Sequence, residues 1–249
     1  MNVLNDKPDF SNLLSPLEAK ILLQRLTTLT SNVNASSTDS WNLNNNQCLE
    51  NVKSEWQRLE RLERLATIKG LDGTPSLVNK YEQAATDWLI QLFNNLFVHQ
   101  NVTLVRGQGE PEYFPAQNNE PARIEFAHGF FASALHELSH WCVAGEARRR
   151  LPDFGYWYAP DGRTAAQQQA FERVEIKPQA LECLFTLACE RSFEVSQDNL
   201  FADFDTSNST FANDVYRQVQ QYIAKPNILP SDAKTLLHAL LSVSIADPE

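Results

Sequence analysis

Residues 136–140 read His-Glu-Leu-Ser-His, which is the HExxH pattern of metal-binding helices. Four residues advance an α-helix by about 400°, so His136 and His140 would project from one face and could bind the same metal ion. Glu137 would point about 100° away from His136, where it can contact a metal-bound water or a substrate without being a ligand. The pattern therefore predicts a metal site with Glu137 beside it as a catalytic group.

A third protein ligand is expected, because a catalytic metal usually has three and keeps a further position open. Glu146 lies six residues after His140, but Gly145 directly precedes it, and arginines three and four positions later offer it a surface salt bridge. Glu172 and Glu175 lie in a later helical segment, and Glu175 is 175 − 140 = 35 residues beyond His140, which leaves room for a second helix beside the first. We favour Glu175, followed by Glu146 and Glu172, with Glu110 as a further loop candidate.

Side chains outside the motif could form a substrate pocket. His128 lies eight residues before the motif at the expected end of a strand, where it could contact the substrate or serve as a hydrogen-bonded structural residue. The segment 153–162 is rich in aromatic residues, which could line a pocket or fill the core. The three arginines at 148–150 suit a helix end, or could dock an acidic macromolecule. The predicted substrate-contacting residues are His128, Tyr156, Tyr158 and Asp161.

Helices must position most of these groups. The motif lies in a predicted helix from about 130 to 145, and a second helical segment runs from 164 to about 191. Pro178 should kink or divide that second segment. Two β-rich stretches, 102–105 and 123–127, predict short strands. Further helices are expected over 81–96 and in two segments after 208 that are separated at 226–230. We therefore expect an α+β fold that is helix-rich, has a small sheet and carries its metal site on the HExxH helix.

The first 77 residues are predicted to form a helical N-terminal extension, and residues 78–249 to form the domain with the metal site. The tetrapeptide 15–18, Ser-Pro-Leu-Glu, is typical of a capped helix start. Apolar residues from 49 to 65 recur at helical spacing and predict a second helix. Between these helices, residues 31–47 are dominated by Ser, Asn and Thr, a composition that cannot offset the entropy of ordering, so we expect a flexible linker.

Composition limits the partners. The 249 residues contain 21 Lys and Arg against 31 Asp and Glu, so the net charge is 21 − 31 = −10. Because phosphate contacts need surplus positive charge, this balance argues against nucleic acid or a membrane surface as the main partner. No segment approaches the about 18 apolar residues of a membrane span, and the N-terminus lacks the features of a signal peptide. The 4 cysteines form no CxxC pair. A cytoplasmic protein with reduced, mostly buried thiols is therefore expected.

Several segments together resemble the elongation factor P hydroxylase family. They are Phe-Ala-His-Gly-Phe at 126–130, the motif with its Trp-Cys continuation at 136–142, the aromatic and Pro-Asp-Gly-Arg stretches within 153–163, and Val-Glu-Ile-Lys-Pro-Gln-Ala-Leu at 174–181. The resemblance extends from about residue 81 to about residue 204 and leaves the N-terminal extension outside. It implies an oxidoreductase that hydroxylates elongation factor P after translation, on a lysine that has already received a β-lysyl group.

The resemblance also implies a metal triad of two histidines and one carboxylate, with His136 and His140 in the histidine positions. The family's Val-Glu-aliphatic-Lys-Pro segment falls on Glu175, whereas the position of Glu146 need not be acidic in relatives. Hydroxylation of an unactivated C–H bond needs a redox-active metal, so Fe(II) is the expected cofactor rather than Zn²⁺, which has no accessible redox chemistry. Acidic residues of the 153–162 loop could then receive the cationic lysyl side chain of β-lysylated elongation factor P.

Two other functions share the HExxH motif. In a zinc metallopeptidase, Glu137 would be the general base that activates a zinc-bound water. In a binding protein, the metal would be structural and would normally be closed by four protein ligands, often cysteines, of which only Cys142 lies near His140 in the sequence. The long flanking segments favour the hydroxylase.

Overall fold

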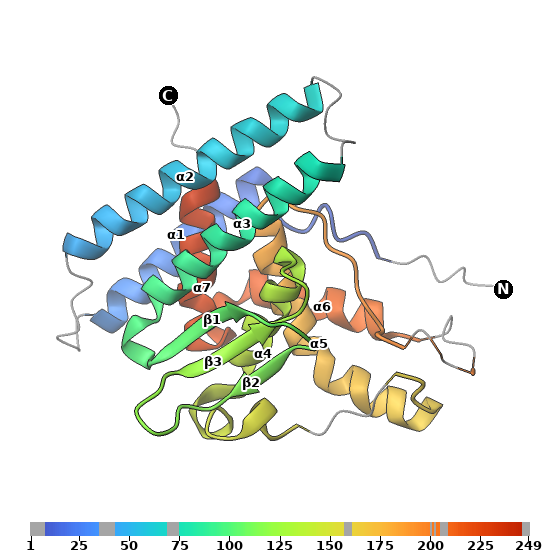
Figure 1. The fold of residues 1–249 in the computed structure, drawn as a ribbon. Coiled ribbons are helices and arrows are strands. Elements are labelled where there is room, and N and C mark those ends of the chain that lie inside the picture. Colours follow the sequence, from blue (N-terminus) through green and yellow to red (C-terminus); the bar gives the residue numbers. More distant parts are fainter. Residues whose placement is uncertain are drawn as a thin grey trace.

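The structure is a computed structural model that describes residues 8–34, 43–68, 75–156, 161–199, 201, 203–204 and 209–245. Its helices are α1 (Pro16–Asn34), α2 (Leu43–Ile68), α3 (Pro75–Leu96), α4 (Phe131–Arg148), α5 (Ala165–Ala188), α6 (Phe211–Ala224) and α7 (Ser231–Ser244). Its strands are β1 (Val102–Arg106), β2 (Glu112–Phe114) and β3 (Ala122–Phe126). Figure 1 shows the strands gathered in one small sheet among the helices. The predicted helix-rich α+β fold is confirmed.

The sheet has the order β1-β3-β2. Strand β1 pairs in parallel with β3, and β2 pairs antiparallel with it. Side chains alternate between the buried face, which includes Leu104 and Ile124, and the open face, which includes Arg123. The sequence did not predict β2, because a strand of three residues is too short to display an alternating pattern.

Side chains from the helical layer cover both edges of the sheet. The Asn94 side chain of α3 accepts the Leu104 backbone N–H at 2.7 Å and donates to the Leu104 carbonyl at 3.3 Å, as a neighbouring strand would. At the opposite edge, the Asp153 carboxylate accepts the Tyr113 backbone N–H at 3.0 Å. Both edges therefore have some of their backbone groups paired, which limits pairing with other chains.

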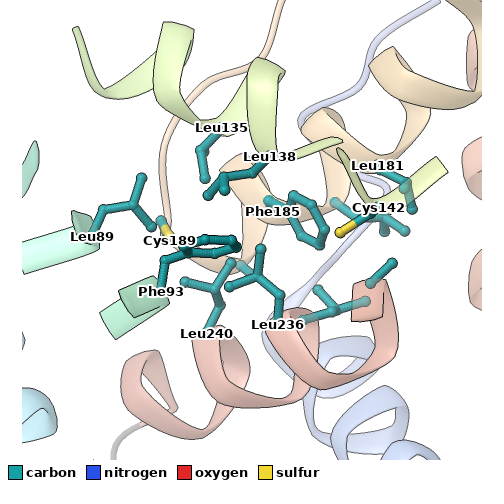
Figure 2. Packing of buried hydrophobic residues seen from close by; sticks show 14 of the residues in the cluster. Leu89, Phe93, Leu135, Leu138, Cys142, Leu181, Phe185, Cys189, Leu236 and Leu240 are labelled. Atoms are coloured by element: carbon teal, nitrogen blue, oxygen red, sulfur yellow. The ribbon is translucent and has the colours of Figure 1, made fainter. Parts of the chain in front are cut away.

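The core lies where α3, α4, α5 and α7 meet (Figure 2). Each helix contributes apolar side chains that are almost completely buried, which are Leu89 and Phe93 from α3, Leu135 and Leu138 from α4, Leu181 and Phe185 from α5, and Leu236 and Leu240 from α7. Cys142, Cys183 and Cys189 are free thiols buried in the same core. Burial raises the pKa of Cys189 to about 12, so this thiol is protonated and unreactive at neutral pH.

The N-terminal helices share this core. Ser15 and Glu18 form the predicted capping box, in which the Ser15 N–H donates to the Glu18 carboxylate at 3.0 Å and the Glu18 N–H donates to Ser15 Oγ at 3.3 Å. Helix α1 packs along α7, and the Arg25 guanidinium donates to the carbonyls of Ile223 and Ala224, at 2.9 and 2.7 Å, at the end of α6. Figure 1 shows α2 beside α3, which agrees with their contacts.

Two local predictions in the N-terminal half need comment. The predicted linker 31–47 is helical at both ends, because α1 continues to Asn34 and α2 begins at Leu43. The flexible-linker prediction is wrong for these ends, since extending an existing helix by one residue costs far less than starting one; residues 35–42 lie outside the described part. The predicted division at residue 77 falls within α3 and stays a prediction.

Helix α5 runs without interruption through Pro178, so the predicted division of this segment is wrong. A proline inside a helix costs about 3 kcal/mol. Pro178 is buried and is followed by the buried residues Gln179 to Leu181, so tertiary packing of this turn offsets the local cost. The helix begins with a capping box in which Thr164 and Gln167 bond reciprocally. Glu175 therefore sits in the middle of a long, continuous helix.

Candidate metal centre

Contacts from α3 fix the start of the HExxH helix. The turn before α4 contains His128 and Gly129, both with positive φ (54° and 73°). No side chain of the N-cap residue Phe130 caps α4. Instead, the Glu82 carboxylate of α3 accepts the Phe131 backbone N–H at 2.7 Å, and Thr86 donates to the Gly129 carbonyl at 3.2 Å. The negative charge of Glu82 at a helix N-terminus also suits the helix dipole.

His136 and His140 meet Glu175 where α4 packs against α5. The two imidazole Nε2 atoms are 3.1 Å apart. One oxygen of Glu175 lies 3.3 Å from His140 Nε2, and the other lies 3.8 Å from His136 Nε2. Within the described residues this is the single group of three or more His, Cys, Asp or Glu side chains with ligand atoms close enough to hold one metal ion. The sequence had left the third ligand open, and the structure brings Glu175 to the two histidines.

The buried carboxylate of Glu175 fits a metal ion. Its side chain is 1% exposed, and neither oxygen has a hydrogen-bond donor of normal geometry among the described residues. A buried carboxylate without donors is costly, and a cation between it and the two imidazoles would remove that cost. Ligand atoms 3–4 Å apart are also what metal–ligand distances of about 2.0–2.2 Å require. Two nitrogens and one oxygen form the donor set of a facial triad, which leaves open positions on the metal.

A second glutamate of α5 orients His136. Glu182 Oε2 lies 2.8 Å from His136 Nδ1. A carboxylate at Nδ1 holds the proton there and leaves Nε2 free for a metal, which is the usual arrangement around metal-binding histidines. Sequence reasoning missed Glu182. Its signal was its position seven residues after Glu175, which is two helical turns and therefore the same face.

The carboxylates around the histidines shift several pKa values. Burial alone would lower the pKa of His136, but Glu182, Glu175 and Glu137 outweigh it and raise the pKa to about 10. For Glu175, burial favours the neutral form, yet the imidazoles of His140 and His136 lower its pKa below the usual value. Burial raises the pKa of Glu137 despite the opposing effect of the two histidines. The centre is therefore an anionic site that retains protons until a metal displaces them.

The competing third ligands lie elsewhere. Glu146 is exposed, just after the non-helical residue Gly145. The predicted salt bridge from Glu146 to Arg149 is wrong, because Arg149 pairs with Asp232 at 2.6 Å. Glu172 accepts a hydrogen bond from the Ser209 hydroxyl at 2.9 Å. Glu110 is exposed in the β1–β2 loop. None of the three glutamates belongs to the metal-ligand group.

Two arginines at the end of α4 serve the fold. Arg148 donates to the Phe154 carbonyl at 2.8 Å, and its guanidinium carbon lies 3.6 Å from the centroid of the Tyr156 ring. Arg149 bonds to Asp232 and stacks 3.4 Å over Trp141. The suggested docking role for the whole arginine run is not supported for these two side chains, since both are engaged within the protein.

The predicted substrate-contacting residues have varied surroundings. His128 is exposed in the turn before α4, with its ring 6.1 Å from that of Phe130. Tyr156 packs against the core beneath Arg148. One oxygen of Asp161 accepts the N–H groups of Gly162 and Phe201, at 2.7 and 3.3 Å. Tyr158 lies outside the described residues. The roles of these residues stay predictions.

Comparison with known proteins bears on residues around this centre. Among the described residues, no helix is long and apolar enough to span a membrane. Residues 92–246 match the family model described as Elongation factor P hydroxylase. The chain is also 46% identical over 156 residues to the elongation factor P lysine hydroxylase of Haemophilus influenzae, which covers 62% of this chain and 86% of that relative. With the HExxH helix and Glu175 both inside the matched region, the chain belongs to the elongation factor P hydroxylase family.

Proposed function

We propose that this protein hydroxylates a lysine of elongation factor P, in the form that already carries a β-lysyl group. The observation that carries the proposal is the buried triad of His136, His140 and Glu175 inside the region that matches the family. The named activity of the relative at 46% identity supports hydroxylation over peptide cleavage. The reaction would place one oxygen atom on a side-chain carbon of the modified lysine.

We propose Fe(II) as the metal, held by the two Nε2 atoms and the Glu175 carboxylate. When bound, Fe(II) supplies the redox chemistry that attack on an unactivated C–H bond needs, and Zn²⁺ does not. Glu182 keeps the His136 ring in its ligating orientation through the contact at Nδ1. The apolar side chains beneath the centre, such as Leu135 and Leu138, exclude water from its inner side.

The remaining carboxylate of the motif, Glu137, would contact the substrate. It is half-buried beside both histidines, and its raised pKa shows that burial disfavours its charged form. A cationic lysyl tail next to Glu137 would stabilise the carboxylate and would itself be held in place. His128, Tyr156, Tyr158 and Asp161 are proposed to contact the same substrate at greater distance from the metal. This arrangement agrees with the net charge of −10, which favours a partner side chain with extra amines.

Mass spectrometry of elongation factor P tests the proposal. In cells without this gene, the modified lysine should lack the mass of one oxygen atom, and the wild-type gene should restore it. The His136→Ala gene should not restore it, because the metal ligand is lost. Persistence of the oxygen in the deletion strain, with no other hydroxylase present, would refute the activity. Shortened elongation factor P that appears only with the wild-type gene would instead favour the zinc peptidase.

A further inference from the structure

The first turn of the metal-binding helix is packed between aromatic rings and a guanidinium group. Phe131, which begins α4, is 1% exposed. The Trp56 ring of α2 stacks on it, with centroids 6.0 Å apart and planes 26° apart. The Arg191 guanidinium carbon, just beyond α5, lies 4.2 Å from the centroid of the same ring. We call Trp56, Trp88, Phe131, Arg191 and Glu82 the Phe131 cluster.

Polar contacts tie the cluster together. The two oxygens of Glu82 are divided between the Phe131 backbone N–H, at 2.7 Å, and Arg191, at 2.9 Å. Trp88 of α3 packs 4.2 Å from the Trp56 ring, and its indole N–H donates to the Val52 carbonyl of α2 at 2.8 Å. The position of α2 is therefore fixed by α3, and α2 in turn presses the Trp56 ring against the start of α4.

The cluster lies one short step along α4 from the metal ligands. His136 follows Phe131 by five residues, or about 7.5 Å along the helix axis. The two helices run antiparallel, because Phe131 lies beside Arg191, His136 beside Glu182 and His140 beside Glu175. A shift at the first turn of α4 would move His136 relative to Glu175 and Glu182, and metal ligands must be held within about 0.5 Å of their working geometry.

We propose that Trp56 is a positioning residue for the metal centre, so that α2 of the N-terminal extension supports the metal-binding helix. Helix α2 lies outside the residues 92–246 that match the family, so this support comes from a part of the chain beyond the matched region. The proposal rests on the metal triad of the proposed function, but not on the identity of the substrate. It gives the extension a role in holding His136 rather than in binding a separate partner.

The test uses Trp56→Ala and Trp56→Phe in the full-length protein. The matched control is Leu62→Ala, which removes an apolar side chain of α2 that is 42% exposed. In the metal-free protein, hydrogen exchange of the amides of residues 131–136 should be about tenfold faster in Trp56→Ala, close to wild type in Trp56→Phe and unchanged in Leu62→Ala. Affinity for Co²⁺, followed by its visible absorption, should fall about tenfold in Trp56→Ala alone.

Wild-type exchange and wild-type Co²⁺ affinity in a folded Trp56→Ala protein would overturn the proposal, as would equal changes in Leu62→Ala. If Trp56→Ala does not fold, Trp56→Leu takes its place with the same readouts and the same expected changes, since it keeps apolar volume without the ring face. A wild-type protein that binds no Co²⁺ would contradict the metal centre itself. Amide exchange in the metal-free protein would then still decide whether Trp56 holds α4.

Discussion

The middle of α4 and its C-terminal end both bury charged side chains, but only one of them satisfies those charges within the protein. At the C-terminal end, Arg149 bonds to Asp232 at 2.6 Å, to Gln100 at 3.0 Å and to the Trp141 carbonyl at 2.9 Å. In the middle, Glu175 is more deeply buried and yet has no hydrogen-bond donor among the described residues. A charge with its partners stabilises the fold, whereas a charge without them indicates a site for a ligand.

Loss of a histidine should have the largest effect. His140→Ala removes one of two nitrogen ligands, so binding of about one equivalent of Fe(II) under anaerobic conditions is expected to disappear. Anaerobic titration with metal analysis measures this. Glu146→Ala, which changes an exposed glutamate in the same stretch of chain, should bind Fe(II) normally. Retained binding in His140→Ala would remove His140 from the ligand set.

The paired end of α4 should respond in the opposite way. Asp232→Ala leaves Arg149 without its carboxylate, and the free energy of unfolding should fall by about 2 kcal/mol. Urea denaturation of the metal-free protein measures this loss. The folded variant should bind Fe(II) as wild type does, because the Arg149 contacts lie beyond the metal ligands. A large loss of metal affinity with unchanged stability would reverse the distinction between the two regions.

The contact at Nδ1 of His136 predicts a smaller effect. Glu182→Gln keeps the size of the side chain but removes its charge, and we expect metal affinity to fall on the order of 10-fold, the lower end for partners of ligating histidines. Co²⁺ titration of the purified variant provides the measurement. Glu172→Gln is the matched control on the same helix, since Glu172 bonds to Ser209 and not to a ligand. Equal affinities for the wild type and Glu182→Gln would mean that Glu182 does not orient His136.

Metal affinity should also depend on pH. The pKa of His136 in the metal-free protein is raised to about 10, so at neutral pH a metal must displace a proton from this ring. Affinity should therefore rise with pH, by at most about tenfold per unit for one proton, between pH 6 and 8. The same raised pKa stabilises the metal-free fold most fully below the unfolded value of about 6.5, and this contribution is lost as the pH rises through about 10. Isothermal titration at several pH values tests the first trend, and a pH-independent affinity would contradict it.

The sequence predicted those parts of the centre that depend on short-range spacing. The HExxH pattern places His136 and His140 on one helix face whatever surrounds them, and the helix itself is confirmed. Glu175 was favoured because a later helix could pack beside the first, and the structure brings its carboxylate to both imidazoles. The family was also predicted from the sequence and is confirmed by the match over residues 92–246.

Features that depend on tertiary contacts were harder to predict. Glu182 becomes recognisable only when α4 and α5 are known to pack antiparallel, since its partner His136 is 46 residues away. Strand β2 exists because β3 offers it a partner, not because its three residues prefer the extended state. Likewise, Pro178 remains inside α5 because the surrounding turn is buried. In each case packing decides where local preference alone points elsewhere.

The central claim is that Glu175 completes a metal centre with His136 and His140 that elongation factor P hydroxylation requires. The most direct test is the mass of elongation factor P from cells that carry either Glu175→Ala or Glu146→Ala in place of the wild-type gene, with both variants shown to be present and folded. We predict that the modified lysine lacks its added oxygen with Glu175→Ala and carries it with Glu146→Ala. Added oxygen with Glu175→Ala and none with Glu146→Ala would contradict the assignment.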